Sequence, residues 1–369
     1  MKFFYLITKS ESGGPQTHLS QLGSYLIGKG HKVAIMAYPG GWLEGEAKRI
    51  GIKFYPNRFF DNSIKPIQEI RALFLIEKAL ADFKPDLLSC HSTKAGILGR
   101  LAPRFGMKTL FTAHGWAFTE GVPAWRQFPV TFLERLCANF CSKIICVSEH
   151  DRQLALKNNI APEKKLITVH NGVEVSKEMP AKDYSGKLKI VFTGRLVAPK
   201  DPFSLVKAVS LLPDDLRSKV EVSIIGGGSY EQELRELISQ LQLDDKVKML
   251  GALPRSEVFK VLAPAHIFAL ISDWEGLPRS ILEAMSSGMV TIASEVGGVA
   301  EMVEESSGFL VKRRDVEGVK DALIKLLSDP GLIKEMGKKA HQKALEKFSL
   351  EKMIESTVGV YEEMLSRKI

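Results

Sequence analysis

The sequence predicts an α/β protein made of two doubly wound domains with parallel sheets. Its 369 residues are more than one hydrophobic core usually organises. The composition, 45% hydrophobic and 25% charged, is that of a folded protein with sizeable cores. Short apolar, β-branched or aromatic runs alternate with amphipathic stretches along the chain, which indicates βαβ units.

Six apolar runs in the first half are expected to form strands. They lie at residues 3–8, 32–37, 87–90, 109–113, 144–147 and 166–169. Residues 17–29 and 66–82 carry apolar side chains at three- and four-residue spacing, so we expect helices there. Pro66 suits the first turn of the second helix.

The polar stretch at residues 174–187 has neither helical nor strand periodicity. We expect it to link the domains. We therefore expect one domain at residues 1–178 and another at 179–350. Strands of the second domain are expected at residues 189–193, 220–225, 247–250, 267–270 and 290–293. Three helical segments close the chain, at residues 317–327, 332–348 and 351–366. We expect residues 351–369 to pack back onto the first domain.

The positive charge is confined to the first domain. Residues 1–178 hold 24 Lys+Arg and 15 Asp+Glu, a net of +9, and the remainder holds 27 and 28, a net of −1. This asymmetry favours an anionic partner of the first domain, such as a membrane surface, a phosphorylated substrate or nucleic acid. A basic surface that is merely solvated explains it equally well.

The sequence also indicates where the protein resides. No apolar stretch approaches the roughly 20 residues needed to cross a bilayer, and the N-terminus shows no cleavable signal pattern. We therefore expect a cytoplasmic protein.

The four cysteines form no Cys-x-x-Cys pair, so we expect core thiols and no metal site. They are Cys90, Cys137, Cys141 and Cys146.

Glycines and cations follow several predicted strands. Gly13 and Gly14 follow the first strand, and glycines 226–228 follow a strand of the second domain. Such glycines let backbone N–H groups approach a phosphate, although many are only turns. Arg195 and Lys200, five residues apart past another strand end, can converge on one diphosphate. Two unrelated surface cations are the alternative.

The strongest signal is residues 272–284. A strand ends near residue 270, a Gly-Pro loop follows, and a helix is expected to begin at Ser280 or a neighbour. Glu275 lies in the loop and Glu283 about one turn into the helix. Two carboxylates so placed suit the hydroxyls of a sugar and a ribose, while the helix N-terminus faces phosphate.

Glu275 and Glu283, with seven residues between them, resemble the EX7E motif of the retaining GT-B glycosyltransferases of family four. Other segments follow in the order that this family shows. They are Gly13-Gly14, Thr112-Ala113-His114-Gly115, Asn171-Gly172-Val173, and Gly194-Arg195 with Lys200. The resemblance spans nearly the whole chain and implies the GT-B fold, with two Rossmann-like domains facing a central cleft.

The resemblance implies roles for the second domain in binding a nucleotide-sugar donor. Arg195 and Lys200 would hold the diphosphate, and Glu283 would accept hydrogen bonds from the ribose. Glu275 would position the donor sugar and its phosphate together with Gly276, Leu277 and Pro278. The loop at residues 251–254, which includes Leu253, would lie against the nucleobase.

The first domain would bind the acceptor. The resemblance implies that Gly13 and Gly14 close over the donor phosphate and that His114 faces the donor sugar near the reacting carbon. His114 as a purely structural side chain is the alternative. The catalytic residues would then be Glu275, His114, Arg195 and Lys200.

The resemblance also implies retention at the anomeric carbon, with no protein base. The chain has no Asp-x-Asp triplet, so we expect cations and helix dipoles in place of a divalent metal, and no cofactor. UDP is the expected nucleotide. Residues 112–123 resemble bacterial exopolysaccharide and lipopolysaccharide transferases, in which a polyprenyl-diphosphate-linked sugar is extended.

Cations and aromatic residues of the first domain suggest peripheral attachment to the inner face of the cell membrane. The cations Lys94, Arg100, Arg104 and Lys108 recur around one predicted helix, and Trp125, Arg126, Phe128, Phe132, Arg135 and Lys143 follow around the next. Such a surface suits an anionic leaflet. The alternative is an ordinary amphipathic helix with its apolar residues in the core.

Four other functions are alternatives to a glycosyltransferase. A nucleotide-sugar epimerase shares the architecture, and only the glutamate spacing with Arg195 and Lys200 argues against it. An NAD-dependent oxidoreductase lacks its glycine fingerprint, and a nucleic-acid binder lacks a recognisable module. A non-catalytic nucleotide-sugar-binding protein of the same shape stays open.

Overall fold

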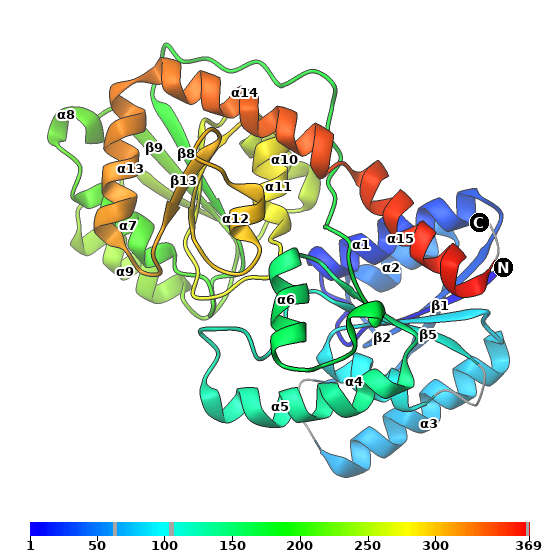
Figure 1. The fold of residues 1–369 in the computed structure, drawn as a ribbon. Helices are drawn as coiled ribbons and strands as arrows, with labels where there is room; N and C mark the ends of the chain where they lie inside the picture. Colours follow the sequence, from blue (N-terminus) through cyan, green and yellow to red (C-terminus); the bar gives the residue numbers. More distant parts are fainter. Residues whose placement is uncertain (62–64, 103–106, 367–368) are drawn as a thin grey trace. The chain divides into compact units, whose positions relative to one another are not determined.

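The computed structural model describes residues 1–61, 65–102, 107–366 and 369. The chain forms two compact units, each around its own parallel sheet (Figure 1). Unit 1 comprises residues 1–171 and 351–369, and unit 2 comprises residues 172–350. The expected boundary at residue 178 therefore falls inside unit 2.

Unit 1 contains a seven-stranded sheet in the order β3-β2-β1-β4-β5-β6-β7. All neighbouring strands are parallel. The strands are β1 (Lys2–Leu6), β2 (Lys32–Ala37), β3 (Lys53–Pro56), β4 (Leu87–His91), β5 (Lys108–Ala113), β6 (Lys143–Cys146) and β7 (Leu166–Thr168). The strand order changes direction between β1 and β4, which places a topological switch point there.

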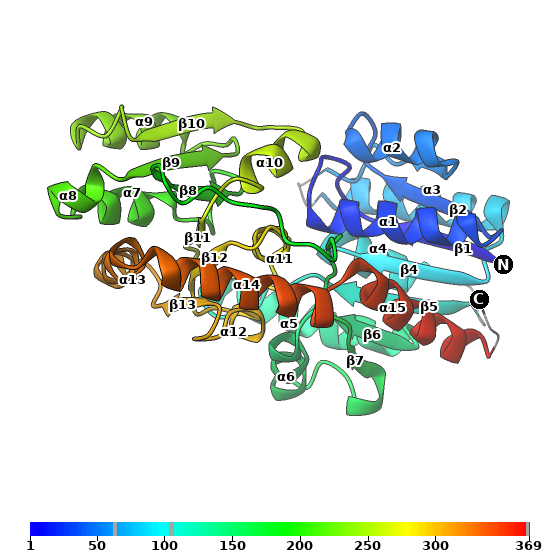
Figure 2. The same cartoon turned by 90° about the horizontal axis from the view of Figure 1, so that it is seen from above.

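Helices cover both faces of this sheet (Figures 1 and 2). They are α1 (Gly14–Gly28), α2 (Trp42–Ile50), α3 (Pro66–Phe83), α4 (Thr93–Leu101), α5 (Ala124–Cys137), α6 (Glu149–Lys157) and α15 (Leu350–Leu365), with 3₁₀ turns at Ala138–Phe140 and Glu163–Lys165. Helices α1, α2 and α15 lie on one face, and α3, α4 and α5 lie on the other. Tyr361 of α15 stacks on Phe3 of β1, with ring centroids 5.6 Å apart.

Unit 2 contains a six-stranded parallel sheet in the order β10-β9-β8-β11-β12-β13. The strands are β8 (Leu188–Thr193), β9 (Val220–Ile225), β10 (Val247–Gly251), β11 (Ile267–Leu270), β12 (Val290–Ser294) and β13 (Gly308–Val311). The helices are α7 (Pro202–Ser210), α8 (Asp214–Arg217), α9 (Glu231–Gln240), α10 (Arg255–Leu262), α11 (Arg279–Ser286), α12 (Val299–Met302), α13 (Val316–Ser328) and α14 (Pro330–Lys347). Helix α7 packs against α9 and α13, and α11 packs against α10 and α14.

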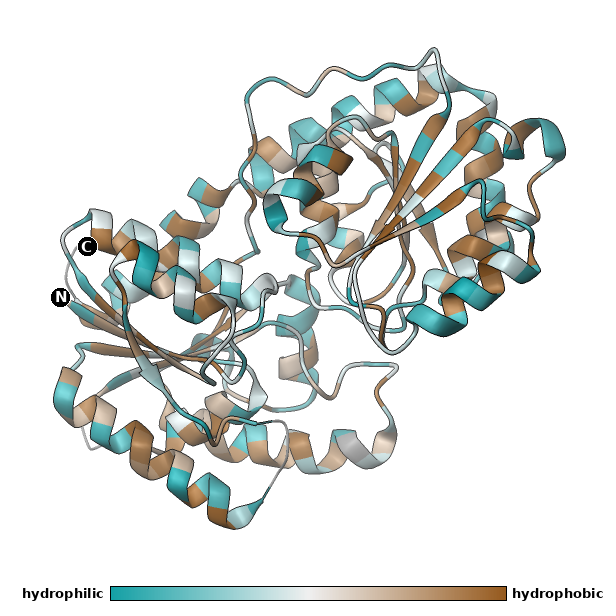
Figure 3. Ribbon diagram, turned by 180° about the vertical axis from the view of Figure 1, so that it is seen from behind, coloured by the Kyte–Doolittle hydropathy of each residue, from teal (hydrophilic) through white to brown (hydrophobic). Residues whose placement is uncertain are grey.

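The central strands of both sheets are largely apolar (Figure 3). Every residue of β4, β11 and β12 is buried. A parallel sheet that helices cover on both faces requires such continuous apolar strands. This pattern explains why these strands were predicted from sequence.

Two of the edge strands, β3 and β13, were not predicted, whereas the edge strands β7 and β10 were. The outer strand β3 has no buried residue, and β13 has two of four. A half-exposed edge strand lacks a continuous apolar run, so its sequence gives little signal.

Helix α1 begins at Gly14, with Pro15 in its first turn, and not at residue 17 as predicted.

The stretch expected to link the domains forms no regular element, and part of it is fixed to unit 2. Lys182 Nζ donates to the main-chain oxygens of Ala263 and Ala265. Burial lowers the pKa of this amine to about 8. His266 Nε2 lies 2.9 Å from the main-chain oxygen of Asp183. The segment is therefore anchored to the sheet of unit 2.

Two further findings concern cysteines and membrane spans. Cys90, Cys137, Cys141 and Cys146 are buried free thiols, as the sequence predicts. Among the described residues, no helix has the length and hydropathy that a bilayer-spanning segment requires.

Candidate active site

The sheet of unit 2 has its topological switch point between β8 and β11. From β8 the chain proceeds outward to β9 and β10, and from β11 it proceeds in the opposite direction to β12 and β13. Ligands of open α/β sheets bind where two such loops diverge, at the carboxyl ends of the strands. The relevant loops are residues 194–201 and residues 271–278.

These two loops are joined along their backbones. Lys200 and Ser272 form an isolated antiparallel bridge. The N–H group of Asp201 donates to the oxygen of Ile271 at 2.9 Å. Arg195 is exposed at the start of the first loop. The loop after β8 is thus fixed at Lys200 and presents Arg195 to solvent.

Lys200 and Glu275 form an ion pair across the switch point. Both side chains are mostly buried, with exposed fractions of 15% and 11%. The backbone beside Glu275 is also fixed, because the N–H group of Gly298 donates to the oxygen of Gly276 at 2.8 Å. A Cβ atom on Gly297 would lie 2.0 Å from the oxygen of Glu275. The structure therefore brings together one predicted cation and one predicted carboxylate.

Glu283 lies in α11, where two arginines that sequence reasoning missed face it. Arg255 Nε lies 3.8 Å from Glu283 Oε1. Arg279 is buried, and its Nη1 donates to the oxygen of Gly172 at 2.7 Å. Burial raises the pKa of Glu283, and the charges of Arg279 and Arg255 oppose this rise. Burial lowers the pKa of Arg279 to about 10. Glu283 is thus a mostly buried carboxyl between two cations.

The loop predicted to contact the nucleobase connects β10 to α10. Leu253 is partly exposed there. The oxygen of Gly251 accepts from the N–H group of Gly226 at 2.8 Å, which ties this loop to the end of β9. In the loop before α11, Leu277 is buried and Pro278 is the N-cap of the helix.

Glycines 226–228 allow the loops after β8 and β9 to approach each other closely. A Cβ atom on Gly226 would lie 1.8 Å from the oxygen of Gly194, and Gly226 has φ of 142°. A Cβ atom on Gly228 would lie 2.4 Å from the oxygen of Leu196. The N–H group of Gly228 donates to Glu231 Oε1 at 2.9 Å. These glycines therefore have a packing role.

In unit 1, His114 follows β5 at the carboxyl edge of the sheet and is half-buried. Its Nε2 lies 2.9 Å from Nδ1 of His91, the last residue of β4. Gly13 is the N-cap of α1 and Gly14 its first residue. These residues belong to unit 1, and the other predicted donor-binding residues belong to unit 2.

Two family models match consecutive parts of the chain. The model of Glycosyltransferase Family 4 matches residues 12–177, and that of Glycosyl transferases group 1 matches residues 177–343. The chain is a group 1 glycosyltransferase of family 4. The family inferred from the glutamate spacing and the strand-end residues is thereby confirmed.

Two relatives of this glycosyltransferase come from a bacterium. The chain is 29% identical over 328 residues to an Escherichia coli protein named UDP-Gal:alpha-D-GlcNAc-diphosphoundecaprenol alpha-1,3-galactosyltransferase, with 83% of this chain and 82% of that protein covered. It is 28% identical to the E. coli O-antigen biosynthesis glycosyltransferase WbnH, with 84% and 86% covered.

Solved structures show the same fold. A sucrose-phosphate synthase from Thermosynechococcus elongatus matches with a TM-score of 0.84 at 18% identity, covering 99% of each chain. Anabaena HepE in complex with UDP-glucose matches with a TM-score of 0.82 at 17% identity, covering 98% of this chain and all of that one. The predicted GT-B fold is confirmed. The glycosyltransferase is a hexosyltransferase that acts on nucleotide-sugar donors.

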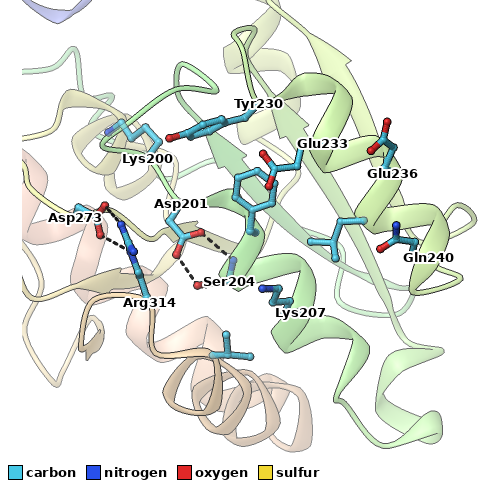
Figure 4. Close-up of a pocket in the computed structure, with 13 residues that line it drawn as sticks. Lys200, Asp201, Ser204, Lys207, Tyr230, Glu233, Glu236, Gln240, Asp273 and Arg314 are labelled. Atoms are coloured by element: carbon cyan, nitrogen blue, oxygen red, sulfur yellow. Dashed lines mark hydrogen bonds and ion pairs between the residues drawn. The ribbon is translucent and has the colours of Figure 1, made fainter.

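A pocket of about 440 Å³ in unit 2 adjoins the switch point of the glycosyltransferase (Figure 4). Lys200 lines it, whereas Arg195, Glu275 and Glu283 do not. At its edge Arg314 binds Asp273 with two hydrogen bonds, of 2.9 and 2.6 Å. This pocket therefore shares only Lys200 with the predicted donor site.

The predicted cationic surface of unit 1 is largely wrong. Arg100 is fully buried, where its Nη2 lies 2.6 Å from Glu134 Oε2 and its guanidinium packs over Phe111. Lys94 is mostly buried and pairs with Glu69 at 2.9 Å. A buried cation requires such a partner, so neither side chain is available to a lipid headgroup.

Of the other predicted cations, Lys108 and Arg135 are exposed. Lys143 is mostly buried and pairs with Glu363. Arg104 and the side chain of Arg126 lie outside the described residues.

The apolar part of that surface is exposed. Trp125, Phe128 and Phe132 of α5 have exposed fractions of 76%, 79% and 54%. The alternative of a helix with these residues in the core is therefore wrong. Glu134 occupies the buried face of the same helix.

Gly226→Ala tests the packing of the donor-site loops. The substitution should destabilise unit 2 by at least about 2 kcal/mol, because φ near 142° strains an L-residue and the added Cβ meets a carbonyl oxygen. Urea denaturation measures the loss. Gly186→Ala, where a Cβ meets nothing within 4 Å, is the matched control and should change little. Equal effects of the two substitutions would contradict this account.

Proposed function

We propose that this enzyme transfers a hexose from a UDP-sugar, with retention at the anomeric carbon, to a polyprenyl-diphosphate-linked glycan in bacterial surface-polysaccharide synthesis. The observation that carries the proposal is the Lys200–Glu275 pair at the switch point of unit 2, with Arg195 exposed in the same loop. The relative at 29% identity is named for UDP-Gal and a diphosphoundecaprenol acceptor, which supports both substrates.

Arg195 and Lys200 hold the donor diphosphate. When the bond from the sugar anomeric carbon to the phosphate oxygen breaks, negative charge develops on the leaving UDP. The two cations, both in the loop after β8, stabilise this charge without a metal ion, and the sequence has no Asp-x-Asp triplet to hold one. Lys200 is fixed by its backbone bridge to Ser272, so its position is set before the donor binds.

The two carboxylates bind the donor on either side of the diphosphate. Glu283 accepts hydrogen bonds from the ribose, and Glu275 with Gly276, Leu277 and Pro278 positions the sugar. Arg255 and Arg279 counter the effect of burial on the pKa of Glu283, which favours its ionised, accepting form. Leu253 in the loop after β10 contacts the base.

Retention follows from attack on the face that the leaving group occupies. The acceptor hydroxyl oxygen bonds to the anomeric carbon as the phosphate departs, and its proton passes to the departing diphosphate oxygen. No protein base is needed for this step. His114 of unit 1 contacts the donor sugar near the reacting carbon, and Gly13 and Gly14 contact the phosphate.

Nucleotide binding tests the donor site. In calorimetry against UDP, GDP, ADP and dTDP, we expect UDP to bind equally well with Mg²⁺ and with EDTA. Glu283→Gln should weaken that binding about tenfold or more, since a hydrogen bond to a charged group contributes about 1.5–3 kcal/mol. Glu257→Gln, on the exposed side of α10, is the control. Unchanged UDP affinity in Glu283→Gln refutes the ribose assignment.

Unit 1 attaches to the membrane surface through an apolar face, which consists of Trp125, Phe128 and Phe132 on α5 and Ile67, Ile70 and Phe74 on α3. All six side chains are at least half exposed. The two helices lie on the same face of the sheet, with α4 packed against both. Interfacial helices bury such side chains at the boundary of headgroups and acyl chains.

The charges around the apolar face suit an anionic leaflet. Arg135 is exposed on α5, and Lys65, Arg71 and Lys78 are exposed on or beside α3. Glu134 is buried, so its carboxylate does not oppose them, whereas Glu77 of α3 is exposed next to Lys78 and offsets one positive charge. The polyprenyl chain of the proposed acceptor lies in a membrane, so an enzyme bound at the membrane surface is close to its acceptor.

Vesicle flotation tests this attachment. The wild-type enzyme should float with anionic vesicles at low salt, and the double substitution of Phe128→Asp with Phe132→Asp should reduce the bound fraction more than tenfold, because a fully buried Phe contributes roughly 1.5–3 kcal/mol. Leu211→Asp, at a half-exposed apolar site in unit 2, is the control and should still float. A wild-type protein that stays unbound refutes the proposal.

A further inference from the structure

Three histidines of unit 1 gather at the carboxyl edge of its sheet, near the switch point between β1 and β4. His18 comes from α1, His91 ends β4 and His114 follows β5. The ring centroids of His91 and His114 are 5.2 Å apart, and His18 lies 5.9 Å from the first and 5.3 Å from the second. Sequence reasoning gave a role only to His114.

His91 uses both of its ring nitrogens. Nε2 lies 2.9 Å from the hydroxyl oxygen of Ser89, and Nδ1 lies 2.9 Å from His114 Nε2. The side chain is fully buried, so water does not compete for either contact. The structure thus contains a hydrogen-bonded chain from a buried serine through a buried imidazole to the half-buried His114.

His91 is neutral within this chain. Burial holds its pKa well below the ordinary value, and the neighbouring His114 and His18 act in the same direction. The other ring that faces it is Tyr5 of β1, at 5.9 Å. Burial raises the pKa of the Tyr5 phenol, so it is also uncharged. A neutral imidazole carries one proton, which sits on either Nδ1 or Nε2.

The serine decides which nitrogen carries that proton. An imidazole nitrogen is a far more basic acceptor than a hydroxyl oxygen, so the Ser89 hydroxyl donates to His91 Nε2. The proton of His91 is then on Nδ1, and His91 donates to His114 Nε2. A neutral His114 in turn carries its own proton on Nδ1.

We propose that His91 is a positioning residue for the transfer reaction, which fixes the ring of His114 through Nε2 and makes its Nδ1 an N–H donor toward the substrate. The inference rests on the proposed contact of His114 with the donor sugar. In this arrangement Nε2 of His114 is bonded to His91. His114 can therefore contact the substrate only through the opposite edge of its ring, where Nδ1 lies. His91 itself touches no substrate.

Two substitutions of His91 separate positioning from packing. The amide of Asn places a polar group near the position of Nδ1, and that of Gln near the position of Nε2. His91→Asn therefore retains a partner for His114, whereas His91→Gln retains only the partner of Ser89. His91→Gln should lower kcat by about 10²-fold with little change in donor KM, as expected for a misplaced contact group. His91→Asn should recover most of that loss.

The readouts distinguish the inference from a structural role. Activity should not fall further when His91→Gln is combined with His114→Ala, because both remove the same contact. Equal losses in His91→Asn and His91→Gln, or additive losses with His114→Ala, overturn the inference. Full activity of His114→Ala refutes the proposed role of His114. The UDP affinity of Glu283→Gln tests the proposed function separately.

NMR of the ¹⁵N-histidine-labelled full-length protein tests the proton positions without an activity assay. The His114 signals should show the Nδ1–H tautomer in the wild type. Ser89→Ala is a small change that leaves the buried His91 ring in place. It should remove the preference of His114 for the Nδ1–H tautomer, so that signals of both His114 tautomers appear. A wild-type His114 with its proton on Nε2, or a tautomer that Ser89→Ala leaves unchanged, overturns the inference.

Discussion

The ion pair between Lys200 and Glu275 organises the candidate active site of unit 2. It joins the two loops that diverge at the switch point of the sheet, where the backbone bridge between Lys200 and Ser272 already brings them together. Both side chains are mostly buried, so removing either leaves a charge with no counterpart. Asp273, in the same loop, binds Arg314 and extends the connection to the loop after β13. The proposed diphosphate site depends on this arrangement.

Much of this site was predictable from sequence, for physical reasons. Buried parallel strands give continuous apolar runs, so the carboxyl ends of β8 and β11 were recognisable, and the residues that follow them include Arg195, Lys200 and Glu275. Arg255 and Arg279 were not predicted as partners of Glu283. Their role follows from the packing of α10 against α11, which local sequence patterns do not specify. The glycines 226–228 resembled an anion-binding loop or a turn in the sequence, and their contacts add a packing requirement that the sequence did not indicate.

In unit 1 the predicted cationic surface was wrong because charged residues were assumed to be exposed. Arg100 and Glu134 are buried against each other, and Trp125, Phe128 and Phe132 on the neighbouring helix are exposed. Helical periodicity identifies two faces but does not say which one meets the sheet, and here the acidic residue faces inward. His91 gave no signal either, because its importance arises from a contact with His114, which lies on the adjacent strand end. Contacts of this kind exist only in the folded sheet.

The measurement that tests the account most directly is the affinity for UDP of Lys200→Gln, Glu275→Gln and the double variant, each determined by calorimetry. If Lys200 exchanges Glu275 for the donor diphosphate, Lys200→Gln weakens UDP binding, and Glu275→Gln preserves or strengthens it while abolishing transfer. The double variant should then behave like Lys200→Gln. Loss of UDP binding in Glu275→Gln as large as that in Lys200→Gln would show that the pair only supports the fold, and would contradict the assignment of the donor site.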